Sequence, residues 1–146
     1  MRKTKELFIY GVVLFALAVL DVIMLVMDFR AGEFAMITSP DALAQDITNA
    51  IILGVLGLIV LSIAIGFYLG VKGIEQSRRP TRARLHIFLA RLCGTLNLIL
   101  TVFMALTLFG STDLFNDLAT LASCAADMIL MYAYANAAKA VRNGAY

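Results

Sequence analysis

The segment IILGVLGLIVLSIAIGFYLGV, residues 51–71, decides the fold class of this chain. It contains no charged residue and has the length of about 20 apolar residues that a helix needs to cross a hydrocarbon core of roughly 30 Å. Three more apolar runs of similar length precede and follow it. The sequence therefore predicts four spanning helices, at about residues 7–27, 50–71, 87–108 and 114–134.

The composition of the whole chain supports the same class. Of the 146 residues, 62% are hydrophobic and only 15% are charged, whereas a soluble domain carries about 25% charged residues. A chain of this length buries only about two-thirds of its unfolded surface, so much of the apolar excess must face lipid. In lipid, helices satisfy every backbone hydrogen bond. We therefore expect one all-α domain, residues 1–146, that forms an integral membrane bundle of four helices.

The basic residues predict the orientation, because segments rich in lysine and arginine stay in the cytoplasm. The connection between the first and second runs, residues 28–49, and that between the third and fourth, residues 110–113, are acidic or nearly neutral. Both termini are thus expected in the cytoplasm, in a plasma membrane or a bacterial inner membrane. The basic residues lie at the two termini and between the second and third runs: Arg2, Lys3, Lys5, Lys72, Arg78, Arg79, Arg82, Arg84, Lys139 and Arg142.

The connections carry local signals of their own. In the outer loop, residues 28–49, Ser39 is a candidate N-cap before Pro40 and Asp41, which predicts a short helical collar. The loop GSTD, residues 110–113, is so short that the third and fourth helices must be antiparallel neighbours.

The inner loop, residues 72–86, is strongly basic. Attraction to anionic lipid headgroups, at about 1 kcal/mol per basic residue near the surface, accounts for such a loop. A specific lipid or nucleic-acid site is the sharper alternative; anionic lipids are the expected partner and nucleic acid is not. The residues assigned to headgroup contact are Arg78, Arg79, Arg82 and Arg84.

Polar side chains recur inside three of the runs. By helical spacing Asn97 and Thr101 share a face of the third helix, and Thr120 and Asp127 share a face of the fourth. Lipid rejects such faces, so we expect them to face one another. They form a hypothetical binding seam of Asp21, Asn97, Thr101, Thr120, Ser123 and Asp127.

Two charged positions leave alternatives open. At 1.5 Å per residue, Arg91 and Asp127 fall in the inner third of the membrane, where they could pair, although Arg91 could equally snorkel to the headgroups. Asp21 falls in the outer third. It could be protonated and hydrogen-bonded, line a water-filled pocket open to the outside, or pair with a basic residue of another protein.

Small residues mark a packing face on the second helix, because they allow helix backbones to approach closely. Ser62, Gly66, Gly70 and Gly73 follow this spacing. The neighbouring helix could belong to the same chain or to a second copy.

The residues that most enzymes and cofactor sites need are missing from the sequence. The cysteines, Cys93 and Cys124, form no CxxC pair, and His86 is the only histidine. Neither an HExxH motif nor a glycine-rich phosphate loop occurs. We expect no catalytic residues, no metal site and no cofactor.

Two functions remain open. The first, which the sequence favours, is a non-enzymatic accessory or structural subunit whose intramembrane faces bind one another or a larger membrane complex. The alternative is a small transporter or channel that binds a cation, proton or small polar solute at the polar seam. We expect it to be a homo-oligomer, because four short helices enclose little room. A pocket shared by Asp21 and Asp127 would favour the second function.

Overall fold

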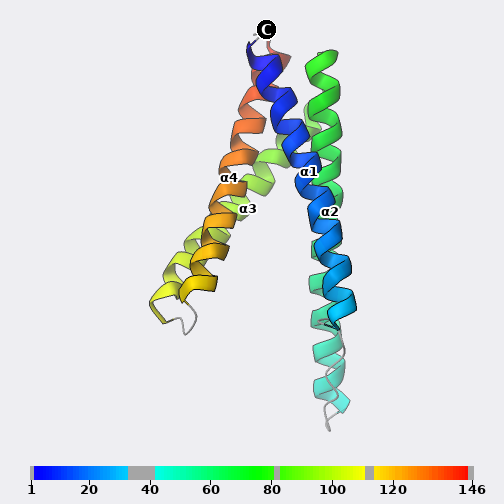
Figure 1. Cartoon of the computed structure of the whole chain (residues 1–146), viewed down its shortest axis with the longest axis vertical. Coiled ribbons are helices and arrows are strands. Elements are labelled where there is room, and N and C mark those ends of the chain that lie inside the picture. Colours follow the sequence, from blue (N-terminus) through cyan, green and yellow to red (C-terminus); the bar gives the residue numbers. More distant parts are fainter. Residues whose placement is uncertain (1, 33–41, 81–82, 111–113, 145–146) are drawn as a thin grey trace.

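The computed structural model of the chain describes residues 2–32, 42–80, 83–110 and 114–144. Within these residues the fold is all α, as predicted. Helix α1 is Arg2–Ala31, α2 is Ala42–Arg78, α3 is Leu85–Thr107 and α4 is Leu114–Arg142, with a short 3-10 helix, η1 (Leu108–Gly110), after α3 (Figure 1). Each of the four long helices contains a stretch long and apolar enough to cross a membrane.

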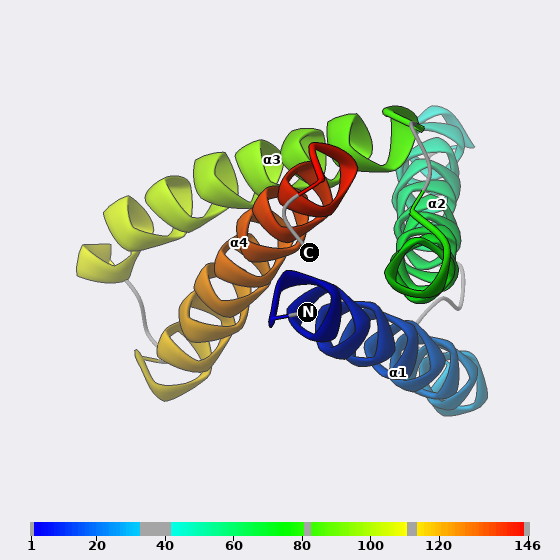
Figure 2. The ribbon, with the colours of Figure 1, turned by 90° about the horizontal axis from the view of Figure 1, so that it is seen from above.

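The helices form two hairpins, and the hairpins form a V (Figure 1). Helix α1 packs along α2, and α3 packs along α4, as the short connection between the latter two predicts. The hairpins meet where α1 and α3 begin and where α2 and α4 end, which we call the closed end. They diverge toward the opposite, open end. Viewed from the closed end, α4 lies next to α1, while α2 and α3 meet at their connected ends (Figure 2).

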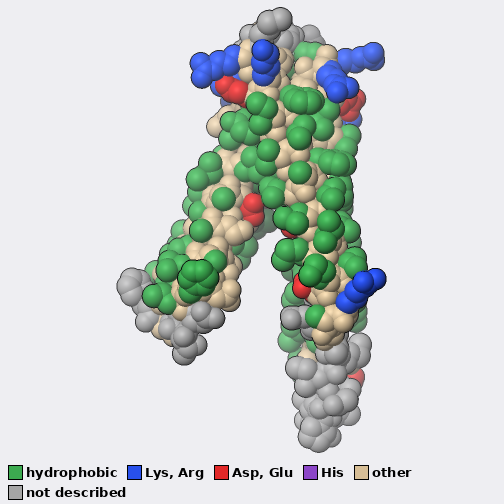
Figure 3. Space-filling model, viewed as in Figure 1, with side chains coloured by type: hydrophobic (Ala, Val, Ile, Leu, Met, Phe, Trp, Pro, Cys, Tyr) green, Lys and Arg blue, Asp and Glu red, His purple; other side chains and the backbone are tan. Residues whose placement is uncertain are grey.

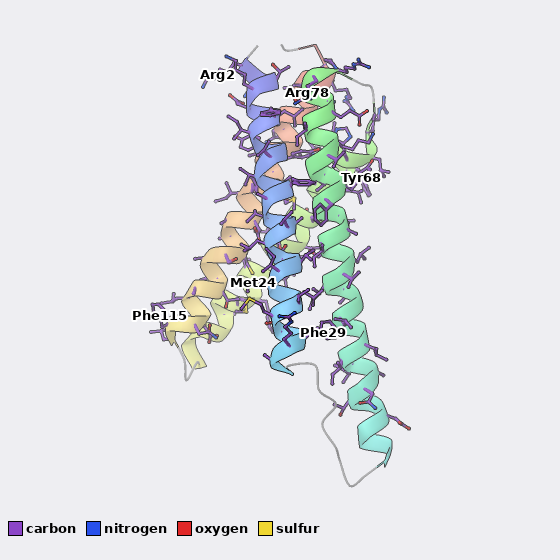
Figure 4. All side chains as sticks on the ribbon, turned by 45° about the vertical axis from the view of Figure 1, so that its right-hand side comes forward. Arg2, Met24, Phe29, Tyr68, Arg78 and Phe115 are labelled. Atoms are coloured by element: carbon purple, nitrogen blue, oxygen red, sulfur yellow. The ribbon has the colours of Figure 1, made fainter. Side chains whose placement is uncertain are left out.

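The buried core lies at the closed end and takes residues from all four helices. Leu7, Leu69 and Tyr134 are completely buried there. Away from this end apolar side chains are widely exposed, such as Leu58 at 67% and Phe115 at 85% (Figures 3 and 4). The core consists of Leu7, Leu14, Leu69, Ile87, Ala90, Tyr134, Ala135, Ala137, Ala138 and Val141.

Glycines allow α1 and α2 to approach closely near the closed end. A Cβ added to Gly70 would lie 2.9 Å from the backbone nitrogen of Phe15, and one added to Gly66 would lie 3.2 Å from the Cβ of Ala18. The partner of this face of α2 is thus α1 of the same chain. Ser62, assigned to the same face from its spacing, is exposed instead.

The helices extend beyond the apolar runs from which they were predicted. Helix α2 continues to Arg78, so that the inner connection is shorter than the predicted loop of residues 72–86. At the other end α1 continues to Ala31, and Gly32, with a φ of 77°, follows it in the left-handed conformation that often ends a helix. The predicted cap at Ser39, Pro40 and Asp41 lies outside the described residues.

Candidate functional site

A pocket of about 320 Å³ lies between the two hairpins. Helix α4 contributes Asp127, and α2 contributes Ile59, Ser62 and Ile63. Acidic side chains are visible beside the gap between the hairpins in Figure 3. From α1 the lining residues are Asp21, Met24, Leu25 and Asp28.

Helical geometry explains why these residues meet. Asp21, Leu25 and Asp28 are four and three residues apart, so they share one face of α1. The contact between α1 and α4 at the closed end brings Asp127 to the same pocket. Three carboxylates from two hairpins therefore line one space.

Among the described residues that line it, the pocket has three acidic side chains and no compensating basic one. Asp127 is partly buried, Asp21 is exposed, and the two are close enough for their charges to interact. Within the described residues neither carboxylate has a lysine or arginine nitrogen within 4.0 Å. Like charges near a low-dielectric surface repel each other, so a proton or cation between them would lower the energy of the site.

The acids are spaced rather than clustered. In the described parts of the chain, no three histidine, cysteine or acidic side chains are grouped so that they could hold one metal ion. Carboxylates spaced in this way could attract a proton or a small organic cation.

The other members of the predicted seam do not line this pocket. The hydroxyl of Thr101 donates to the carbonyl of Asn97 at 2.7 Å, and that of Thr120 donates to the carbonyl of Asn116 at 3.0 Å. Such bonds to the preceding helical turn satisfy a hydroxyl within its own helix. Ser123 is exposed on α4. Of the six predicted seam residues, only Asp21 and Asp127 line the pocket, together with Asp28 and Ser62, which the prediction did not include. The four that do not line it are Asn97, Thr101, Thr120 and Ser123.

Arg91 and Asp127 are not brought together. Arg91 is exposed on α3 and forms no ion pair with the described residues. An exposed position is what the snorkelling alternative requires. A polar contact between α3 and α4 is formed instead by the hydroxyls of Thr95 and Tyr132, which lie 3.0 Å apart.

A buried polar cluster joins three helices at the closed end, and the sequence interpretation missed it. His86 Nε2 donates to Gln76 Oε1, since the Gln76 amide nitrogen faces the carbonyl oxygen of Ala138 at 3.5 Å. The Tyr134 hydroxyl donates to the carbonyl of Leu69 at 2.9 Å. Gln76 was missed because it was placed in a loop. Its spacing from Leu69 and Gly73 is the signal that could have placed it on the buried face of α2.

Comparison with protein families, with curated protein sequences and with solved structures finds no match to this chain. Its class is therefore defined by its own features: four helices able to span a membrane, a V of two hairpins, and an acidic pocket between them.

Proposed function

We propose that this chain is a multi-pass membrane protein with both termini in the cytoplasm. The exposed apolar sides of all four helices support insertion, because lipid is the solvent that suits them. Lysine and arginine side chains gather at the closed end (Figure 3), where both termini lie. Under the positive-inside rule the closed end is cytoplasmic and the open end faces outward.

Cysteine labelling in intact cells tests this orientation. In a chain carrying Cys93→Ala and Cys124→Ala, Arg30→Cys places a thiol at the open end and Asn143→Cys places one at the closed end. A membrane-impermeant maleimide added outside should label the first thiol at least tenfold faster than the second, because charged reagents do not cross lipid. After the cells are opened, both should react. Labelling of Asn143→Cys from outside would contradict the proposal.

We propose, as its function, that the protein binds a cation in the pocket between the hairpins and carries it across the membrane. One observation carries this proposal: Asp21 and Asp127, from different hairpins, line one pocket without a basic partner among the described residues of its lining. Ionisable residues at membrane depth typically mark ion or substrate pathways. The pocket lies on the side of the packed core that faces the open end. With this position, the pocket would take up its ligand from outside the cell. The ligand we propose is a proton or a small organic amine.

Ligand-dependent stability tests the binding step. In detergent, the unfolding midpoint of the wild type should rise by several °C with a cation that binds, because a ligand at 100 times its Kd adds about 2.7 kcal/mol to the stability. The panel contains Na⁺, K⁺, Mg²⁺ and small amines, each at several pH values. In Asp21→Asn and Asp127→Asn the rise should disappear.

The matched control is Asp46→Asn, a carboxylate of α2 that lies outside the pocket and is exposed. It should keep the full response. A flat profile in the wild type, or an equal loss of response in all three variants, would contradict cation binding. Uptake of the binding cation into proteoliposomes then tests the transport step.

A second candidate function is supported by the V shape. Beyond the closed end the described parts of the two hairpins diverge (Figure 1), and both keep exposed apolar side chains, such as Met27 and Leu118. A helix of another membrane protein could occupy the space, which would make the chain an accessory subunit. Wild-type protein without any cation response, but with a stoichiometric membrane partner on gentle purification, would favour this role.

A further inference from the structure

A groove runs along the α1–α2 hairpin at the closed end, on both sides of Arg78. One part, about 400 Å³, is lined by Thr4, Lys5, Phe8, Ile9, Ser77 and Arg78. The other, about 580 Å³, is lined by Phe15, Val71, Ile74, Glu75, Arg78 and Arg79. We call the two parts together the Arg78 groove.

The two parts lie on the same side of the hairpin. Arg78 lines both of them, and Phe8 and Phe15, two helical turns apart, share one face of α1. On α2, Val71, Ile74 and Arg78 likewise share a face. The groove therefore continues from a polar mouth near the helix ends to an apolar floor farther along the hairpin.

Its mouth carries positive charge that has no acidic partner among the described residues. Arg2 and Lys3 pair with Glu6 at 3.2 and 2.8 Å, and Lys72 pairs with Glu75 at 2.7 Å. The charge of Glu75 in the groove is thus matched by Lys72. In the part of the chain that the structure describes, Arg78 has no carboxylate within 4.0 Å, and the same holds for Lys5 and Arg79.

Arg78 is also held in position. Its guanidinium carbon lies 6.0 Å from the centre of the Phe8 ring, at the range of a cation–π contact. No hydrogen bond or ion pair with the described residues occupies the N–H donors of Arg78, so they are available to an anion. Figure 4 places Arg78 near the closed end of α2.

We propose that the Arg78 groove binds an anionic phospholipid. Arginine forms paired, charge-assisted hydrogen bonds with phosphate, and the groove supplies Lys5 and Arg79 beside it. The acyl chains then lie along Phe8, Phe15 and Ile74. This inference needs the chain to be in a membrane with its closed end at the cytoplasmic surface, where anionic lipids are enriched. It does not depend on cation binding between the hairpins.

The proposal differs from general attraction between a basic surface and acidic lipid. General attraction would use every basic residue of the closed end to a similar extent, including Arg2. Binding in the groove depends mainly on Arg78, and it requires a ligand that has both a phosphate and an acyl chain. These two differences define the test.

Lipid binding to the purified protein in mild detergent, measured by native mass spectrometry, distinguishes the cases. The probes are phosphatidylglycerol and phosphatidylcholine with identical acyl chains. The wild type should prefer phosphatidylglycerol by at least fivefold. Arg78→Gln should lower the affinity for phosphatidylglycerol about fivefold, as expected from the loss of one basic contact. Arg2→Gln should leave the affinity for phosphatidylglycerol unchanged, because Arg2 does not line the groove and pairs with Glu6.

Competition identifies the source of the phosphate. Inorganic phosphate and glycerol phosphate, which have no acyl chains, should fail to displace the lipid at a hundredfold excess. Displacement at equal concentration would mean that the groove binds a free phosphate anion, and it would overturn the lipid assignment. An equal effect of Arg2→Gln and Arg78→Gln would overturn it as well. Lys5→Gln provides a second variant, with a loss in the same direction as that of Arg78→Gln.

Discussion

Replacing Gly11 with alanine is expected to lower the free energy of unfolding by about 1–3 kcal/mol, the usual cost of overpacking. An added Cβ would lie 2.9 Å from the backbone nitrogen of Ile74 and 3.0 Å from the carbonyl oxygen of Gly70. Both are backbone atoms of α2, so no side-chain rotation can relieve the clash. The two helices must separate, which loosens the packing of the hairpin. Unfolding of the purified protein in detergent, followed by circular dichroism, measures the loss.

The matched control is Gly54→Ala, also within a helix of the same hairpin. A Cβ there meets no described atom within 4 Å. Alanine is favoured over glycine in a helix by about 0.5–1 kcal/mol, so this variant should be as stable as the wild type or more stable. If Gly11→Ala were as stable as Gly54→Ala, the close approach of α1 and α2 would be refuted.

Replacing Tyr134 with alanine is expected to cost about 3–5 kcal/mol, the range for removing a large buried aromatic side chain. The ring is completely buried where the hairpins meet, and its hydroxyl donates to the Leu69 carbonyl. The ring centre also lies 6.2 Å from that of His86, in an edge-to-face arrangement. Spin labels on α2 and α4 should show a broader distance distribution in the variant, because the joint between the hairpins has lost its largest side chain.

Two milder variants separate the contribution of the Tyr134 ring from that of hydroxyl hydrogen bonds. Tyr134→Phe keeps the ring and loses one hydrogen bond, which should cost about 1 kcal/mol. Tyr132→Phe loses a hydroxyl contact to Thr95 within the α3–α4 hairpin and should leave the distance between the hairpins unchanged. A Tyr134→Ala variant with wild-type stability and distances would contradict the assignment of this ring to the joint.

The sequence was sufficient to predict the four helices and the pairing of α3 with α4. Length and hydropathy define a helix able to span a membrane, and a short connection forces neighbouring helices to be antiparallel. The V could not be predicted in this way, because apolar residues look alike whether they face lipid or another helix. The helix ends were also misjudged. The charges that end an apolar run do not end the helix, so α2 continues through Gln76 to Arg78.

The candidate site was predictable only in part. Asp21 and Asp127 were recognised individually, as acids inside apolar runs. Their depths were estimated from the ends of those runs, which placed them in different thirds of the membrane. Because α4 continues to Arg142, Asp127 lies at the middle of that helix, where it shares a pocket with Asp21. Asp28 and Ser62 could be added only once the relative rotation of the helices was known.

The position of the core also determines the order in which the protein can be completed during synthesis. The ribosome releases the α1–α2 hairpin first, and the close contacts of Gly11, Gly66 and Gly70 lie within that hairpin. The joint between the hairpins needs Tyr134, Ala138 and Val141, which are made after both helices of the first hairpin. The first hairpin can therefore pack along α1 and α2 before α4 exists, and it stays unattached until α4 is made. Joining the two hairpins follows the formation of the first.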